Sequence, residues 1–152
     1  MSEIKTNQEL EVKNVLSFRG KIKPQELDGI VKDMEGKMKS IGVERIGNPI
    51  TATYTVDKDG IDVEVLLPIS KEMDDIGAYK YKERIKIVNA VLLSYKGNPA
   101  GLQNACNELN RYMVDNQLQP ITVGYNITKH IDTINVENTE IDVYVGINPN
   151  IL

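Results

Sequence analysis

Three short segments of this sequence occur twice, in the same order. Residues 16–20 (LSFRG), 48–54 (NPITATY) and 61–67 (IDVEVLL) match residues 93–97 (LSYKG), 119–125 (QPITVGY) and 141–147 (IDVYVGI). The offsets between matching segments are 77, 71 and 80 residues. The two copies therefore differ in the lengths of the segments that connect the matches. A repeated order of this kind predicts two equivalent halves. The alternative is that unrelated segments share common strand residues.

The third segment alternates between apolar and other residues in both copies, which is typical of a β-strand. In the first copy, Ile61, Val63, Val65 and Leu67 share one face, and Asp62, Glu64 and Leu66 share the other. The second copy has Ile141, Val143, Val145 and Ile147 on one face, with Asp142 and Tyr144 opposite. Residues 57–60 (DKDG) predict a tight turn that joins the first copy to a strand over residues 49–56.

One amphipathic helix is predicted in each half, after Pro24 and after Asn98. The apolar stripe of the first helix is Leu27, Ile30, Val31, Met34, Met38 and Ile41, and that of the second is Leu102, Ala105, Cys106, Leu109, Tyr112 and Met113. We expect Leu27, Ile30, Met34, Leu102, Cys106 and Leu109 to be buried. Met34 and Met38 fit core packing better than an adaptable binding surface.

The expected fold class is α+β, with duplicated strand-helix-hairpin units that form one antiparallel sheet and two helices packed on one face. The first strand is expected over residues 10–19, with Gly20 ending it and Ile22 in the following loop. We expect a single domain over residues 1–152. Its repeats cover residues 10–69 and 85–147, joined by a linker at residues 70–78.

Residues 79–87 alternate cleanly and predict another strand. Its apolar face is Tyr79, Tyr81, Ile85 and Ile87, and its basic row is Lys80, Lys82, Arg84 and Lys86. A solvated strand face explains this row better than a docking surface, which stays open as the alternative.

Composition narrows the function classes. The chain has 152 residues, a net charge of −4 and one cysteine, Cys106. No basic patch favours nucleic-acid binding by this chain, and no apolar run approaches the length of a membrane span. We expect a soluble cytoplasmic protein without an intrachain disulfide.

Catalytic and metal-binding patterns are not found in the sequence. His130 is the single histidine, and neither a zinc cluster nor a glycine-rich phosphate loop is present. Cys106 lies on a helix stripe and is interpreted as a structural thiol. The sequence therefore favours a non-enzymatic protein without a cofactor.

The duplicated strand-helix-hairpin, with Pro68-Ile69 ending the strand that starts at Ile61, resembles the GyrI-like effector-binding family. That family includes ligand-sensing domains of multidrug-responsive transcription activators and gyrase-inhibitor-like proteins. The resemblance covers residues 10–147 and implies a ligand cleft between two halves. No DNA-binding segment precedes this region, so we do not expect a complete transcription regulator.

Family members often carry Glu-x-Tyr on the middle strand of the second half, where the glutamate meets cationic aromatic drugs. This chain has Val123-Gly124-Tyr125 there, so the tyrosine matches and the glutamate does not. By repeat symmetry, we expect a ligand cleft lined by Tyr54, Glu64, Tyr125, Asp142 and Tyr144. Glu64 is then the best candidate for the charge that a cationic aromatic ligand needs. The simpler alternative is the solvated face of an ordinary antiparallel sheet.

Three functions follow from these observations. The first is non-enzymatic binding of a small hydrophobic or aromatic ligand. The second is interaction with a protein partner, as an accessory or immunity protein that offers acidic residues, among them Asp74, Asp75, Glu137 and Glu140. The third is hydrolysis of reactive ligands in the cleft, which the resemblance links to the missing glutamate.

Overall fold

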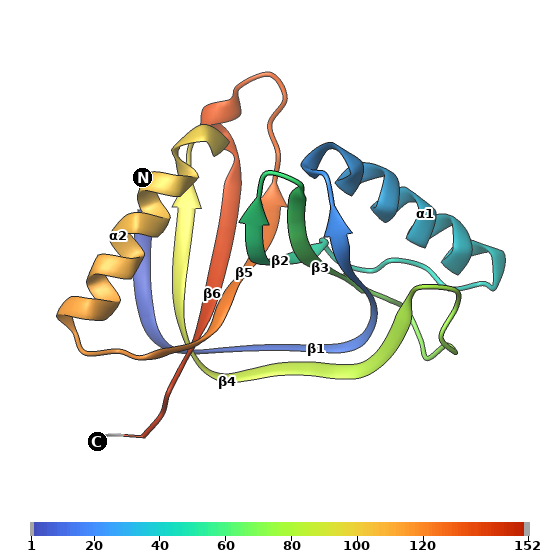
Figure 1. The fold of residues 1–152 in the computed structure, drawn as a ribbon, viewed down its shortest axis with the longest axis horizontal. Helices are drawn as coiled ribbons and strands as arrows, with labels where there is room; N and C mark the ends of the chain where they lie inside the picture. Colours follow the sequence, from blue (N-terminus) through green and yellow to red (C-terminus); the bar gives the residue numbers. More distant parts are fainter. Residues whose placement is uncertain (1, 151–152) are drawn as a thin grey trace. The chain divides into compact units, whose positions relative to one another are not determined.

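The computed structural model describes residues 2–150. They divide into two compact units: a middle unit, Glu11–Lys86, and a terminal unit, which joins residues up to Leu10 to those from Ile87 onward. Each unit contains a strand, an α-helix and a two-stranded hairpin in this order (Figure 1). The predicted α+β class with a strand-helix-hairpin in each half is confirmed. The single-domain assignment and the repeat boundaries stay predictions.

The middle unit has a central strand with an antiparallel neighbour on each side. Strand β3 (Gly60–Pro68) pairs with β1 (Ser2–Ile22) on one side and with β2 (Ile50–Asp57) on the other. The predicted tight turn joins β2 to β3, and Asp57 Oδ1 accepts hydrogen bonds from the amides of Asp59 and Gly60 at 2.8 and 3.2 Å. A short polar side chain at the start of a turn satisfies its amides in this way.

Strand β1 is longer than its sequence predicts. Gly20 does not end it, because pairing with β3 continues to Ile22 opposite Ile61. Ile22 is therefore buried in the strand instead of lying in a loop. At Asn14 the backbone has a φ of 58°, an irregularity that asparagine tolerates and that local sequence patterns do not reveal.

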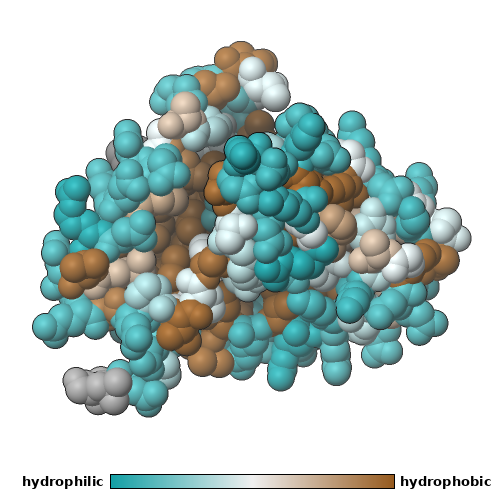
Figure 2. Space-filling view, in the orientation of Figure 1, coloured by the Kyte–Doolittle hydropathy of each residue, from teal (hydrophilic) through white to brown (hydrophobic). Residues whose placement is uncertain are grey.

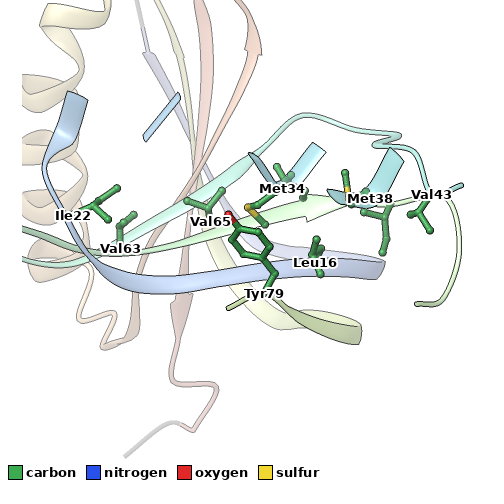
Figure 3. Packing of buried hydrophobic residues seen from close by; sticks show 10 residues of the cluster. Leu16, Ile22, Met34, Met38, Val43, Val63, Val65 and Tyr79 are labelled. Carbon is green, nitrogen blue, oxygen red and sulfur yellow. The ribbon is translucent and has the colours of Figure 1, made fainter. Parts of the chain in front are cut away.

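Helix α1 (Leu27–Ser40) and the strands enclose the core of the middle unit. Met34 and Met38 point into it together with Val63, Val65 and Leu16 (Figure 3). Both methionines are fully buried, as core packing requires. The predicted apolar face of β3 thus lies against its helix, and Glu64 and Leu66 lie on the opposite face.

The terminal unit repeats this arrangement with the part of β4 (Lys80–Lys96) that starts at Ile87, with α2 (Leu102–Asp115), and with β5 (Pro120–His130) and β6 (Glu140–Ile147). Residues 80–86 of β4 belong to the middle unit. Strand β6 pairs antiparallel with β4 and with β5, and α2 lies beside β4 and β6 (Figure 1). The core contains Ala105, Leu109 and Met113 of α2, Val91, Leu93 and Tyr95 of β4, and Ile141, Val143, Val145 and Ile147 of β6. Among residues 2–150, no helix is long and apolar enough to cross a membrane.

Four residues that were expected to be buried are only partly so. Met34 and Leu109 are buried as predicted, whereas Leu27, Ile30, Leu102 and Cys106 are half-buried residues packed against the two cores. Ile41, also placed on the first helix stripe, is 47% exposed because α1 ends at Ser40. An apolar stripe shows which side of a helix packs against the core, but residues at the edges of the stripe stay partly exposed to water.

Alanine substitutions at two glycines of the middle unit should have opposite effects on stability. Gly60 has a φ of +149°, and a Cβ there would lie 2.4 Å from the carbonyl oxygen of Ile22. Gly60→Ala should therefore lower the free energy of unfolding by more than about 1 kcal/mol. Gly36→Ala, inside α1 with no atom within 4 Å of the added Cβ, should raise it by about 0.5–1 kcal/mol. Urea denaturation of both variants measures the two changes in the free energy of unfolding, which should have opposite signs. Equal changes would contradict the described backbone at Gly60.

Candidate functional site

Glu64 is a buried carboxylate at the centre of β3. Its neighbours Val63 and Val65 face the helix, so the alternation of the strand directs Glu64 to the other side. The residue is only 7% exposed. We call this side of the strands, away from the helix, the polar face of each unit.

Three side chains of the middle unit hold the Glu64 carboxylate. Ser17 Oγ and Lys82 Nζ both donate to Oε2 at 2.7 Å, and the Tyr54 hydroxyl donates to Oε1 at 3.3 Å. Burial alone would raise the pKa of Glu64, but the hydrogen bonds from Lys82 and Ser17 and the Lys82 charge together lower it below its ordinary value. Glu64 is therefore an ionised, hydrogen-bonded side chain in an ion pair with Lys82.

Tyr54 reaches Glu64 from a β-bulge. The pairing of β2 with β3 shifts between Thr53 and Thr55, which leaves Tyr54 as the extra residue. The guanidinium carbon of Arg19 lies 3.7 Å from the centre of the Tyr54 ring, a cation–π distance. Arg19 also forms two hydrogen bonds of 2.9 Å with Asp62. One face of the tyrosine ring is thus covered by a cation that the unit itself supplies.

The polar face of the terminal unit carries the other predicted site residues. Tyr125 on β5 is the cross-strand partner of Tyr144 on β6, and both side chains are half-buried. Asp142 Oδ2 lies 3.8 Å from Lys129 Nζ, where a second bulge at Lys129 shifts the pairing of β5. Burial, with a contribution from the Asp142 charge, raises the pKa of Tyr144, so this tyrosine stays a neutral hydrogen-bond donor.

The five predicted site residues therefore fall into two groups, one in each unit. The structure brings Tyr54 and Glu64 into contact and pairs Tyr125 with Tyr144, with Asp142 two residues away along β6. Asp142 also lines a groove of about 190 Å³ within the terminal unit. A joint cleft formed by all five residues stays a prediction.

Sequence reasoning missed the basic partners of these acids. The basic row of β4 was interpreted as a solvated face. The exposed Arg84 and Lys86 fit this interpretation, although both approach Glu11, at 3.3 and 3.6 Å. Lys82 does not fit it, because it pairs with Glu64. Their even spacing on one strand face is a visible signal, but which acid each base meets depends on strand register. Ser17 gives no comparable signal, since a lone serine in a strand is unremarkable.

The comparisons with known proteins identify the fold. The C-terminal domain of EcmrR superposes with a TM-score of 0.76 at 16% identity, covering 97% of both chains. The chain shares the EcmrR C-terminal fold. It spans 57% of the EcmrR chain in a complex with DNA. No protein-family model and no curated protein matches this sequence.

Two further proteins share this EcmrR-like fold. A hydrolase from Listeria innocua matches with a TM-score of 0.61 at 16% identity, covering 97% of this chain and 91% of the hydrolase. SAV2435 bound to tetraphenylphosphonium matches with a TM-score of 0.56 at 10% identity, covering 98% of this chain and 94% of SAV2435. These similarities show the fold alone, so function has to be argued from the side chains of this chain.

Proposed function

We propose that this chain is a non-enzymatic, small-molecule-binding protein of the GyrI-like effector-binding type. The observation that carries the proposal is the burial of Glu64 on the polar face of β3. A solvated sheet face would leave such a residue in water, but Glu64 and its neighbour Leu66 are 7% and 1% exposed. A largely buried carboxylate that is held by a specific charged partner is a candidate feature of a functional site.

The chemistry of the site residues supports an aromatic ligand. Tyrosines combine a large apolar ring with a hydroxyl that fixes orientation, which suits flat organic molecules. Tyr54 contacts Glu64 in one unit, and Tyr125 lies opposite Tyr144 in the other. The fold shared with SAV2435, which was seen with the aromatic compound tetraphenylphosphonium, adds to this proposal.

Catalysis has no comparable support among these residues. Glu64 is held ionised in an ion pair with Lys82, whereas a general acid or base works best with a pKa near the working pH. Burial raises the pKa of the Cys106 thiol, which disfavours the thiolate that a nucleophile needs. We therefore place hydrolysis behind binding.

A thermal-shift screen against uncharged aromatics and hydrophobic cations tests the proposal. A ligand at about one hundred times its dissociation constant stabilises the folded state by about 3 kcal/mol. Tyr54→Ala should abolish the shift. Tyr112→Ala, which removes a half-buried tyrosine of α2, should preserve it. A ligand that shifts wild type and Tyr54→Ala equally would contradict the proposed site.

One observation favours the second candidate, a protein partner. The loop between β5 and β6 carries exposed apolar side chains, since Ile131, Ile134 and Val136 are 65%, 98% and 44% exposed there. Hydrophobic side chains are visible at the top of Figure 2, where this loop lies in Figure 1. Exposed apolar clusters are typical of interaction surfaces. If the ligand screen yields no shift, this loop becomes the leading functional candidate.

A further inference from the structure

Three acids on the polar faces, Asp62, Glu64 and Asp142, each have a basic partner from their own unit. Arg19 pairs with Asp62 at 2.9 Å, Lys82 pairs with Glu64 at 2.7 Å, and Lys129 lies 3.8 Å from Asp142. Two of these pairs lie in the middle unit and one in the terminal unit, and their basic residues come from three strands, β1, β4 and β5. The net charge of these three pairs is zero.

The Lys82–Glu64 pair is the most strongly shielded of the three. The Glu64 side chain is 10% exposed and that of Lys82 is 41% exposed, so the carboxylate is less accessible to water than the lysine that pairs with it at 2.7 Å. Ser17 and Tyr54 also donate hydrogen bonds to Glu64. A cation that approaches Glu64 therefore meets an ammonium group that already occupies the favourable position.

A buried cationic ligand needs an opposite charge that is not already compensated. Beside the intact pair, the attraction of a second cation to Glu64 is offset by its repulsion from Lys82. Arg19 likewise repels a cationic ligand from the Tyr54 ring, because its guanidinium already lies on that ring. An uncharged aromatic molecule meets neither penalty.

We propose that Lys82 is a built-in counter-ion for Glu64, which makes this site select uncharged aromatic ligands over cationic ones. The inference rests on the proposed small-molecule function and names the ligand class. It reverses the expectation from the sequence that a cationic aromatic ligand would depend on Glu64. Removal of the Lys82 charge should convert the site to cation binding.

Three probes of similar shape and different charge test this selectivity: tetraphenylphosphonium, tetraphenylborate and the uncharged triphenylphosphine oxide. Calorimetric titration of wild type should give the tightest binding for triphenylphosphine oxide. Lys82→Gln keeps a hydrogen-bond donor and removes the charge, so tetraphenylphosphonium should gain about tenfold or more in affinity. Glu64→Gln leaves the Lys82 charge uncompensated and should favour tetraphenylborate by a similar factor.

Lys80→Gln is the matched control. It removes the same charge from the same face of β4, two residues from Lys82, and should leave all three affinities unchanged. The double variant Lys82→Gln/Glu64→Gln should lose the gain in tetraphenylphosphonium binding, because the uncompensated carboxylate is gone. Thermal melting of each variant confirms that it is folded before titration, and Lys82→Met serves as a second variant.

The outcomes separate the two proposals. If wild type already prefers tetraphenylphosphonium, or if Lys80→Gln and Lys82→Gln raise its affinity equally, the counter-ion role is overturned while small-molecule binding stands. If none of the three probes binds wild type or any folded variant, the small-molecule function on which the inference rests is overturned as well. A selective gain at Lys82 that needs Glu64 supports both.

Discussion

Leu109→Ala is expected to lower the free energy of unfolding by about 2–5 kcal/mol. Leu109 is 2% exposed, between Ala105 and Met113 on the inner face of α2. Its side chain belongs to the core of the terminal unit, which also contains Val143 and Val145 of β6. The variant loses the favourable free energy of transferring the leucine methyl groups from water into the core. It also leaves a cavity, because packed cores relax only in part.

Urea denaturation monitored by circular dichroism measures this loss. Val114→Ala is the matched control, because Val114 lies on the same helix with 76% of its surface exposed. It should change the free energy of unfolding by no more than about 0.5 kcal/mol. A loss below about 0.5 kcal/mol for Leu109→Ala would mean that the inner face of α2 is misassigned.

The elements that the sequence predicted well are those with local signals. The helix stripe places Leu109 and Met34 on inner faces because side chains three and four residues apart share a face. The Asp57–Gly60 turn was predictable because its side-chain and glycine requirements are local. Period-two alternation likewise assigned Glu64 to the face of β3 opposite Val63 and Val65.

The details of the candidate site depend on long-range register instead. Glu64 lies 47 residues from Ser17 and 18 residues from Lys82 along the chain. Alternation gives the face of each side chain but not which residues meet across strands. The bulge at Tyr54 changes the register in the middle of β2 and has no local signal, so the tyrosine was predicted at the site but its contact with Glu64 was not.

The basic row of β4 shows the same limit for charges. A run of alternating lysines and arginines is ordinarily solvated, and that expectation fits the exposed Arg84 and Lys86. It misses Lys82, which is half-buried because β4 presents it to a carboxylate on β3. The neighbouring strand therefore decides whether a basic side chain is a surface charge or a counter-ion. The sequence of the strand that carries the base does not decide it.

Glu64→Gln should lower the free energy of unfolding at pH 7 by about 1–3 kcal/mol, the usual cost when a buried charged hydrogen-bond group loses its match. Glutamine keeps the shape of the side chain, but it carries no charge for Lys82 and adds an amide donor where Ser17 and Tyr54 also donate. Glu108→Gln, on the exposed side of α2, is the matched control and should change stability by no more than about 0.5 kcal/mol.

The difference between wild type and Glu64→Gln should shrink in acid. Burial acts against the charged form of Glu64, but Lys82, Ser17 and Tyr54 together hold its pKa in the folded protein below the ordinary value of 4.5. The folded state therefore binds this proton less readily than the unfolded chain does, and the stabilisation is fully present above the unfolded pKa. It is lost as pH falls through the lowered folded pKa, where Glu64 becomes neutral like glutamine.

Urea titrations of both proteins from pH 7 to about pH 3 measure this convergence. Curves that stay parallel over the whole range would show that the Glu64 charge does not contribute to folding stability, and that its partners act only as hydrogen-bond donors.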